Sequence, residues 1–420
     1  MKGIIKLVKI YMMRLLMRLL YIFPIKENQL IFNSYRGSQY ACNPKYISEK
    51  LLQLYSGKFE IIWAFNEPEK FDFLKKQGIK VIKFNSFKRF YYEATSKISI
   101  NNVGSFSWLP LRKGQEHINT WHSGLDLTSC GMNEPENDKL TRYSIGLSAK
   151  ETTLFLSANR LFSEYSLQIQ FNYKGTLLEC GLPRSDDLIN RNLFYLRNTI
   201  REKLQIAQDT IVIMYSPTWR YGGANAMPHM DYYMISQAMK KRFGENFVVL
   251  NRSHHLSSNT TYKGIEYVID VTSYPNIEEL VMISDIMISD YSSVMWDGAL
   301  ADIAIIQYTP DAEQYDKERG FYVPIGKWCL PVAYSLMELC KIIQEINLDT
   351  CKSNSKNLLK TVGSLETGEA SLICCYWIAD KCGIDNAHFT DYQKYIHIAN
   401  ELPNASIINK MSTQSDALWK

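Results

Sequence analysis

Serine, arginine and histidine side chains follow short apolar runs in the second half of the chain, an arrangement that suits anion binding. In residues 284–297 such a run ends at Asp290, Ser292 and Ser293, and a helical pattern begins directly after them. Free N–H groups and the helix dipole at such a helix start favour a phosphate or diphosphate. The same side chains could instead only cap the helix. Their surroundings must decide between the two interpretations.

Four more candidates follow other apolar runs or lie in loops of this half. Because the carboxyl ends of parallel strands meet at one edge of a sheet, these side chains should gather there. Arginine clamps stabilise the charge that builds on a leaving phosphate, so an activated diphosphate is the ligand class they predict. No Walker A loop and no GxGxxG after a first strand is present, which disfavours ATP hydrolysis and nicotinamide chemistry. The four residues are Arg220, Arg252, His254 and Arg319.

One histidine of the first half stands in a comparable position. Residues 118–124 end one of the predicted strands, which places Trp121 and His122 at its ligand-facing edge, and Gly124 comes soon after. A histidine at the ligand-facing edge of a sheet can act as a general base near neutral pH. A structural role for a single loop histidine is the alternative. Further along, Pro183 ends regular structure, and Arg184 can reach into a cleft.

Alternating strand and helix patterns must position these residues. Short apolar runs of about one strand each recur from residue 30 to residue 308, with helical patterns between them, which predicts parallel sheets covered on both faces. Residues 351–358 are predicted to form a polar loop. We expect an α/β protein with two doubly wound, Rossmann-like domains that face each other across a cleft. The predicted domains are residues 27–190 and 205–385, with a membrane-association helix at 1–26 and a tail at 386–420.

Size and composition fit this plan. A chain of 420 residues suits two domains, and its 46% hydrophobic content predicts packed cores. The net charge of +4 gives no reason to expect a nucleic-acid partner. Nine scattered cysteines without zinc spacing indicate a reducing, cytoplasmic setting. The sequence contains no cluster of carboxylates from which a metal site could be predicted.

The first 26 residues form a separate basic and apolar segment. Residues 4–23 are almost wholly apolar, and no acidic residue precedes Glu27. The charges make a membrane-spanning helix costly and favour a helix that lies in the plane of an anionic membrane surface. A helix docked on the protein's own core is the alternative. The cations considered are Lys2, Lys6, Lys9, Arg14 and Arg18.

Several short motifs occur in a fixed order between about residue 30 and residue 385. They are Asn33-Ser34 with Gly37 and Asn43-Pro44, Lys113-Gly114-Gln115, Thr120-Trp121-His122, Gly181 with Pro183, Arg184 and Asp186, Pro217-Thr218-Trp219-Arg220, Arg252 with His254, Ser289 to Ser293 with Asp297, and Arg319 to Tyr322. This order resembles the CDP-glycerol glycerophosphotransferase family of teichoic-acid primases and polymerases.

The resemblance implies a glycosyltransferase-B-like fold and a transferase that needs no cofactor. It implies that glycerol phosphate passes from CDP-glycerol to a polyprenol-linked saccharide or a growing teichoic-acid or capsule-type polymer, with release of CMP. His122 would deprotonate the acceptor, and His254 would hold or protonate the donor diphosphate. Such an enzyme would work as a peripheral protein at the cytoplasmic face of the cell membrane. The residues implied in substrate binding are Arg184, Thr218, Arg220, Arg252, Asp290, Ser292, Ser293, Asp297 and Arg319.

Three alternatives stay open at this point. The donor could be CDP-ribitol, or the chain could be a nucleotide-sugar glycosyltransferase of the same fold. It could also be a non-catalytic membrane scaffold for surface-polymer synthesis. The family usually has WHGT and a proline after its RxH motif, whereas this chain has Ser123 and His255 at these points. Both departures lie beside a proposed catalytic histidine and leave the acceptor open.

Overall fold

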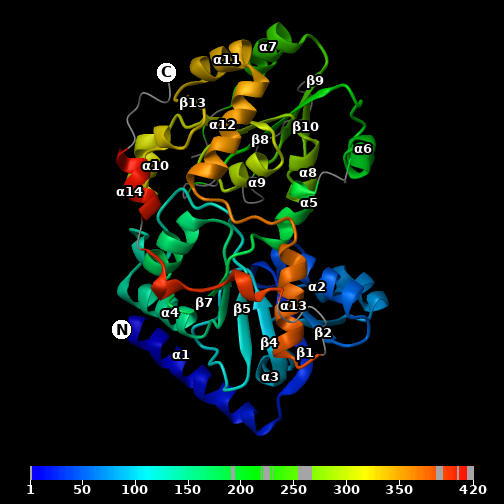
Figure 1. Cartoon of the computed structure of the whole chain (residues 1–420), viewed down its shortest axis with the longest axis vertical. Helices are drawn as coiled ribbons and strands as arrows, with labels where there is room; N and C mark the ends of the chain where they lie inside the picture. The colour runs from blue at the N-terminus through cyan, green and yellow to red at the C-terminus, as the bar shows by residue number, and fades with distance from the viewer. Residues whose placement is uncertain are drawn as a thin grey trace. The chain divides into compact units, whose positions relative to one another are not determined.

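The computed structural model describes residues 2–190, 194–218, 220, 228, 230–253, 267–384, 391–403 and 406–413. The chain divides into two compact units, each with one sheet between layers of helices (Figure 1). The first unit consists of Met1–His122, Cys130–Asp186 and Leu365–Ala405. The second consists of Ser123–Ser129, Asp187–Ser364 and Ser406–Lys420.

The sheet of the first unit has eight strands. They are β1 (Lys26–Asn33), β2 (Glu60–Phe65), β3 (Lys80–Lys83), β4 (Ser96–Asn101), β5 (Glu116–Asn119), β6 (Leu154–Leu156), β7 (Thr176–Leu178) and β14 (Ile396–Ile398). Their order is β14-β7-β6-β5-β4-β1-β2-β3, and every pairing is parallel except β14 with β7. The strand order reverses between β1 and β4. In doubly wound sheets such a reversal point opens a ligand crevice at the carboxyl ends of the strands.

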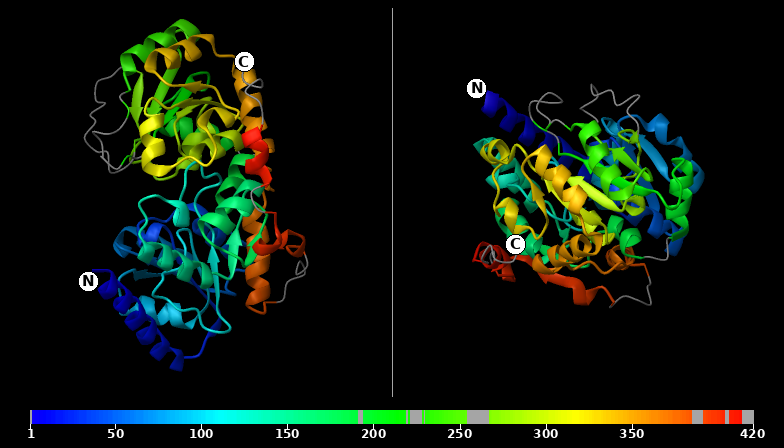
Figure 2. Two further views of the ribbon diagram at one scale, coloured as in Figure 1. Left: turned by 90° about the vertical axis from the view of Figure 1, so that its left-hand side faces the viewer. Right: turned by 90° about the horizontal axis from the view of Figure 1, so that it is seen from above.

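Helices cover both faces of this first sheet. On one face α2 (Cys42–Leu54) packs against α13 (Ala370–Lys381). On the other face α1 (Lys2–Leu19) and α3 (Phe87–Thr95) enclose a core that includes Met17, Ile31 and Ala94. Figure 2 shows α1 and α13 on opposite sides of the sheet. The strands are therefore apolar on both sides, as the sequence pattern predicts.

The C-terminal part of the chain returns to the first unit. α13 buries Ile373, Trp377 and Ile378, and the Sγ of Cys375 lies 3.8 Å from the carbonyl oxygen of Ile47 in α2. β14 then extends the first sheet at its edge. Leu365–Ala405 thus group with the first unit, whereas the predicted second domain runs on to residue 385. The physical reason is that α13 finds its apolar partner on α2.

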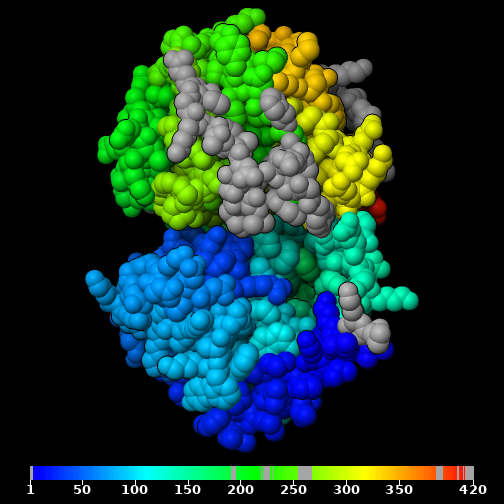
Figure 3. Space-filling model, turned by 180° about the vertical axis from the view of Figure 1, so that it is seen from behind, coloured from blue at the N-terminus to red at the C-terminus, as the bar shows by residue number. Residues whose placement is uncertain are grey.

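The N-terminal helix α1 has apolar side chains on two opposite sides. Its inner side buries Ile10 and Met17 in the first unit. Its outer side is open, and Figure 3 shows the dark blue helix lying along the surface of that unit. The exposed apolar residues recur every three or four positions, which places them on one side of a helix. They are Ile4, Ile5, Val8, Tyr11, Met12, Leu15, Leu16 and Leu19.

One cation of α1 does not behave as the sequence suggests. Arg14 is buried, forms an ion pair with Glu151 and donates from Nη1 to the carbonyl oxygen of Ser107 at 2.9 Å. Arg14 is among the cations predicted to face a membrane, but it faces its own unit and helps to fix α1 there. Among the described residues, no helix combines the length and the apolar character that crossing a membrane requires.

The sheet of the second unit repeats the same plan. Its strands are β8 (Ile211–Ser216), β9 (Phe247–Asn251), β10 (Val268–Asp270), β11 (Ile286–Ser289), β12 (Ala304–Tyr308) and β13 (Val332–Ala333). All pairings are parallel, in the order β10-β9-β8-β11-β12-β13, so the reversal point lies between β8 and β11. This is the Rossmann order, and it also describes six strands of the first sheet.

Helices cover the second sheet on both faces as well. α7 (Tyr232–Phe243) and α11 (Leu336–Glu345) pack on one face around Ile213, Ile286 and Ile306. On the other face α9 (Val294–Leu300) approaches so closely that a Cβ at Gly298 would lie 3.1 Å from the side chain of Met287. The remaining α-helices described are α4 (Lys139–Lys150), α5 (Asp186–Ile189), α6 (Phe194–Lys203), α8 (Ile277–Ile283), α10 (Ala312–Arg319), α12 (Leu348–Thr361) and α14 (Ser406–Thr413).

The predicted polar loop at residues 351–358 is wrong, because these residues belong to α12. Asn347 caps the helix by accepting a hydrogen bond from the backbone N–H of Thr350 at 3.0 Å. Cys351, Ser355 and Leu358 are its buried residues, at the spacing of one helix face. The buried stripe includes the polar residue Ser355, and the residues between its members are mostly polar, so the segment resembles a loop in the sequence.

Candidate functional site

At the reversal point of the second sheet, the ends of β8 and β11 are joined by side-chain hydrogen bonds. The Oγ of Ser289 donates to the carbonyl oxygen of Ser216 at 2.6 Å. The Oδ1 of Asp290 accepts hydrogen bonds from the backbone N–H of Thr218 at 2.8 Å and from its hydroxyl at 2.7 Å. It also accepts from the N–H of Tyr291 at 2.6 Å. Two predicted site residues, Thr218 and Asp290, are therefore brought together.

Arg220 completes this cluster from the buried side. Its Nη2 lies 2.8 Å from Asp290 Oδ2 and its Nε lies 2.7 Å from Asp311 Oδ2, while its side chain is 3% exposed. The guanidinium also stands over the rings of Tyr291 and Tyr315, at 4.8 and 4.5 Å from their centroids. Two carboxylates already balance its charge. This geometry supports a positioning role for Arg220 rather than direct neutralisation of a donor.

Burial and ion pairing act in opposite directions on these groups. Burial disfavours the charged form of Arg220, but its hydrogen bonds and ion pairs with Asp311 and Asp290 raise its pKa above the ordinary value. Burial raises the pKa of Asp290, although Arg220 and Thr218 oppose that shift. Sequence reasoning missed Asp311. A carboxylate three residues after the end of β12 was the available signal, but its partner lies 91 positions away.

Ser292 and Ser293 stand half-buried at the start of α9. The Oγ of Ser292 accepts a hydrogen bond from the N–H of Val294 at 3.3 Å, whereas the side chain of Ser293 makes no capping bond. Asp297 is buried in the first turn of the same helix. Capping thus accounts for one of the two hydroxyls.

A packing contact explains the glycine that follows His122. Gly124 lies so close to Trp296 of α9 that a Cβ would be 2.0 Å from Trp296 Cδ1. Gly124 belongs to Ser123–Ser129, which we call the strap. The strap also pairs with the end of α10, since the N–H of Ser129 donates to the carbonyl oxygen of Gly320 at 2.8 Å. The His-Ser-Gly order therefore places the glycine where the strap meets α9.

The other candidates of the second unit have different surroundings. Arg252 donates from Nη1 to the carbonyl oxygens of Val271 at 3.0 Å and Tyr274 at 2.5 Å, so it fixes the loop that follows β10. Arg319 is the last residue of α10 and is half-buried. His254, His255 and Trp219 lie outside the described residues.

In the first unit, His122 stands just beyond the end of β5. Trp121 adopts a left-handed backbone, with φ of 50°, and turns the chain there. The Nδ1 of His122 lies 2.8 Å from the carbonyl oxygen of Asn102. Because a carbonyl oxygen can only accept, Nδ1 must carry the proton. In the neutral ring Nε2 is therefore unprotonated and can accept a proton.

The surroundings of His122 favour this neutral form. Burial lowers its pKa to about 4, the hydrogen bond to Asn102 opposes the shift, and the charge of Arg184 adds to it. The ring of Tyr35 meets the ring of His122 edge to face, with centroids 5.8 Å apart. His122 is thus oriented by one hydrogen bond and two rings, including that of Trp121.

Asn43 joins three of the motifs in the first unit. Its Nδ2 donates to the carbonyl oxygens of Thr120 at 3.1 Å and Trp121 at 2.9 Å. Its Oδ1 accepts from the backbone N–H of Arg184 at 3.1 Å. The side chain of Arg184 is almost wholly buried. Sequence reasoning treated Asn43 only as part of a motif, because its partners are 77 to 141 positions away.

Two other residues of the Arg184 motif have structural roles. Gly181 has φ of 92°, and a Cβ there would lie 2.1 Å from Glu366 Oε2. Both carboxylate oxygens of Asp186 accept hydrogen bonds at 2.8 Å, from the N–H groups of Ala370 and Ser371 at the start of α13. The motif therefore connects the end of the segment Cys130–Asp186 to the start of α13.

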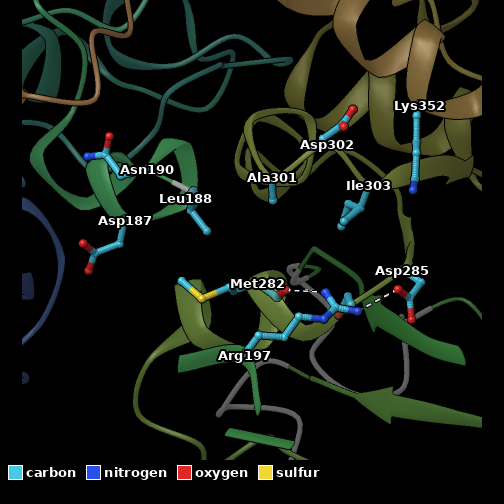
Figure 4. A pocket seen from close by; sticks show the side chains of 11 residues that line it. Asp187, Leu188, Asn190, Arg197, Met282, Asp285, Ala301, Asp302, Ile303 and Lys352 are labelled. Carbon is cyan, nitrogen blue, oxygen red and sulfur yellow. Dashed lines mark hydrogen bonds and ion pairs between the residues drawn. The ribbon is translucent and has the colours of Figure 1, made fainter. Parts of the chain in front are cut away.

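A cavity of about 370 Å³ lies elsewhere, at the amino ends of β11 and β12. Figure 4 shows Arg197 beside it, bonded to the carbonyl oxygen of Met282 at 2.7 Å and to Asp285 Oδ1 at 2.8 Å. Among the described residues, its lining contains none of the predicted site residues. In the whole described part of the chain, no group of three or more His, Cys, Asp or Glu side chains could hold a metal ion.

Comparison with known proteins agrees with the motifs. Residues 15–366 match the family described as CDP-glycerol:poly(glycerophosphate) glycerophosphotransferase. The chain is 30% identical to the teichoic acid poly(glycerol phosphate) polymerase of Bacillus spizizenii, over 77% of this chain and 84% of that one. It is 29% identical to the teichoic acid glycerol-phosphate transferase of Staphylococcus aureus, over 84% and 93%. It spans less than half of two longer polymerases that it also matches.

A solved structure supports the same conclusion. The chain is similar to the wall teichoic acid polymerase TagF, in a variant soaked with CDPG, at 26% identity and a TM-score of 0.75, over 91% of this chain and 97% of that one. The expected α/β class with two Rossmann-like sheets is confirmed, while the cleft stays a prediction. The chain belongs to the CDP-glycerol:poly(glycerophosphate) glycerophosphotransferase family, as its motifs predict.

Proposed function

We propose that this enzyme transfers glycerol phosphate from CDP-glycerol to a hydroxyl group at the end of a polyprenol-linked saccharide or growing teichoic-acid polymer. The observation that carries the proposal is the neutral His122, whose Nδ1–H is engaged by Asn102 and whose Nε2 can take a proton. Nε2 removes the proton of the acceptor hydroxyl. The oxygen then attacks the phosphorus that bears glycerol, the bridging P–O bond breaks, and CMP leaves.

In this proposal the donor diphosphate is bound at the reversal point of the second sheet. The bonds among Thr218, Arg220 and Asp290 fix the loop that carries Ser292 and Ser293, so those hydroxyls are held ready for a phosphate. Arg252, Arg319, Asp297 and, from the first unit, Arg184 remain the other proposed substrate-binding residues. His254 remains the proposed acid for the leaving group.

Purified protein given CDP-glycerol and a lipid-linked saccharide or glycerol-phosphate acceptor should release CMP in step with elongation of the acceptor. CDP-ribitol and nucleotide sugars serve as competing donors in the same assay. Binding of CDP-glycerol without CMP release would favour the scaffold, and release from CDP-ribitol alone would favour the ribitol transferase. A capsule-type product is distinguished by the acceptor that is used.

We further propose that α1 attaches the enzyme to the cytoplasmic face of the cell membrane, where a polyprenol-linked acceptor resides. Its exposed apolar side points away from the first unit, and Lys6, Lys9 and Arg18 are exposed beside it. Apolar side chains that enter the interface, flanked by cations facing anionic headgroups, suit an in-plane helix. Arg14 is excluded from this role by its pairing with Glu151.

Replacing Val8, Leu15 and Leu19 together by glutamine should lower binding to anionic vesicles by about tenfold or more, because the lost apolar area no longer enters lipid. Cosedimentation with vesicles measures the effect. The matched control replaces three exposed apolar residues elsewhere, Phe73, Phe87 and Met337, and should bind like the wild type. Equal binding of the two triple variants would remove α1 as the anchor.

A further inference from the structure

We propose that the reversal point of the first sheet binds the end of the acceptor, and that Asn33, Ser34 and Asn102 hold the hydroxyl next to the one that reacts. The ligand class is a polyol with two neighbouring hydroxyl groups, such as the terminal unit of a glycerol-phosphate chain. The inference deepens the proposed function and rests on it, because it takes His122 as the base.

The position of these residues in the fold is the first argument. Asn33 ends β1, Asn102 directly follows β4, and Asn33 and Asn101 are paired in the sheet. Ligands of doubly wound sheets bind where the strand order reverses, at the carboxyl ends of the strands. Asn102 also accepts the Nδ1–H of His122, so the proposed subsite and the base share one residue.

Buried polar atoms without partners are the second argument. The Oδ1 of Asn33, the Oγ of Ser34 and the Nδ2 of Asn102 have no hydrogen-bond partner among the described residues. These residues are 3%, 0% and 0% exposed. A buried polar atom without a partner costs folding free energy, so three of them at neighbouring strand ends call for a reason. An acceptor oxygen, a hydroxyl and an amide N–H together complement the hydroxyl group of a ligand.

The turn that follows Asn33 and Ser34 is strained. Tyr35 and Arg36 have φ of 46° and 56°, a left-handed conformation that bulky residues seldom adopt. The turn is held by the N–H of Tyr35, which donates to Asn102 Oδ1 at 2.8 Å. Strained backbone of this kind is often found at active sites and ligand sites. Because the three polar atoms are closed off from solvent, acceptor binding requires a local rearrangement around them.

The chemistry of the acceptor supplies a matching group. A chain that ends in glycerol phosphate carries a primary hydroxyl and a neighbouring secondary hydroxyl. The primary one gives its proton to the Nε2 of His122, and the secondary one bonds with Asn102 Nδ2, Ser34 Oγ and Asn33 Oδ1. A site built to bond a substrate hydroxyl strongly rejects an analogue that lacks it.

The test compares two acceptors, one ending in glycerol phosphate and one ending in 3-hydroxypropyl phosphate, which lacks the middle hydroxyl. With CDP-glycerol as donor, the wild type should prefer the first by about 10²-fold or more in kcat/KM, measured as CMP release. Ser34→Ala should lower that preference by about tenfold, since it deletes one hydrogen bond to the middle hydroxyl. Its thermal stability should stay the same or rise, because the deleted Oγ bonds no described residue. Asn102→Asp, which keeps Oδ1 and removes the amide donor, should also lose the preference.

Ser163→Ala is the matched control. Ser163 is equally buried in the first unit, but its Oγ donates to Ser157 at 2.8 Å, so its loss should lower stability and leave the acceptor preference unchanged. If Ser34→Ala keeps the wild-type preference for the glycerol-phosphate acceptor, or if the wild type shows no such preference, the inference is wrong. CMP release in the same assay would still support the proposed function. No CMP from either acceptor would overturn both.

Discussion

Replacing His122 with alanine lowers kcat by about 10²- to 10⁴-fold, because the variant lacks the group that takes the acceptor's proton. Donor binding should stay within a factor of about two, since His122 belongs to the first unit and its Nδ1 bonds to Asn102 of the same unit. Steady-state CMP release gives kcat, and calorimetric titration with CDP-glycerol gives donor affinity. His397→Ala is the control, because His397 is a partly exposed histidine of the same unit. Unchanged turnover in His122→Ala removes this residue from the mechanism.

The pH profile gives a second measure of the same group. The pKa of His122 is lowered to about 4, so the neutral, active ring is present above that value and is lost as the pH falls through it. The acid limb of kcat/KM for the wild type should therefore lie near pH 4, and not near the ordinary histidine value of about 6.5. A limb near 6.5 would mean that another group, or a more exposed His122, controls the rate.

Replacing Arg220 with methionine destabilises the second unit by about 3–5 kcal/mol, because it leaves two carboxylates without their buried partner. Hydrogen exchange of amides in β8 and β11 measures this locally, so the first unit does not obscure the result. CDP-glycerol binding should weaken as well, since the loop that carries Ser292 and Ser293 loses its support.

Two comparisons make the Arg220 result specific. Lys356→Ala breaks the ion pair between Lys356 and Asp302. Because the lysine side chain is 54% exposed, the variant should lose about 1 kcal/mol of stability or less. Adding Asp290→Asn to Arg220→Met should restore part of the lost stability, because one unpaired charge is removed. If Arg220→Met lowers donor affinity with no loss of exchange protection, Arg220 contacts the donor directly and its positioning role is wrong.

Much of the fold could be predicted because parallel strands buried on both faces are short apolar runs, as at Leu30 and Ile286. The polar residues that follow those runs then necessarily share one edge of a sheet. His122 and Asp290 lie just beyond strand ends, as this pattern predicts.

Features that depend on distant partners could not be predicted. Nothing local shows that Arg220 is neutralised by Asp311, or that Arg14 pairs with Glu151, 137 positions away. Asn102 belongs to none of the motifs, and Ser34 stands in the sequence only as part of the Asn33-Ser34 motif. Their proximity appears only when β1 and β4 are seen as neighbours. α12 was missed because two of its three buried residues, Cys351 and Ser355, do not stand out as core residues in a polar stretch of sequence.

The return of the chain to its first sheet has a consequence for biosynthesis. The second unit consists almost wholly of the continuous segment Asp187–Ser364, whereas the first needs Leu365–Ala405 to cover α2 and to supply β14. As the polypeptide leaves the ribosome, the later half can complete its core before the earlier half can. The first unit therefore stays incomplete, with the surface of α2 uncovered, until α13 and β14 have emerged.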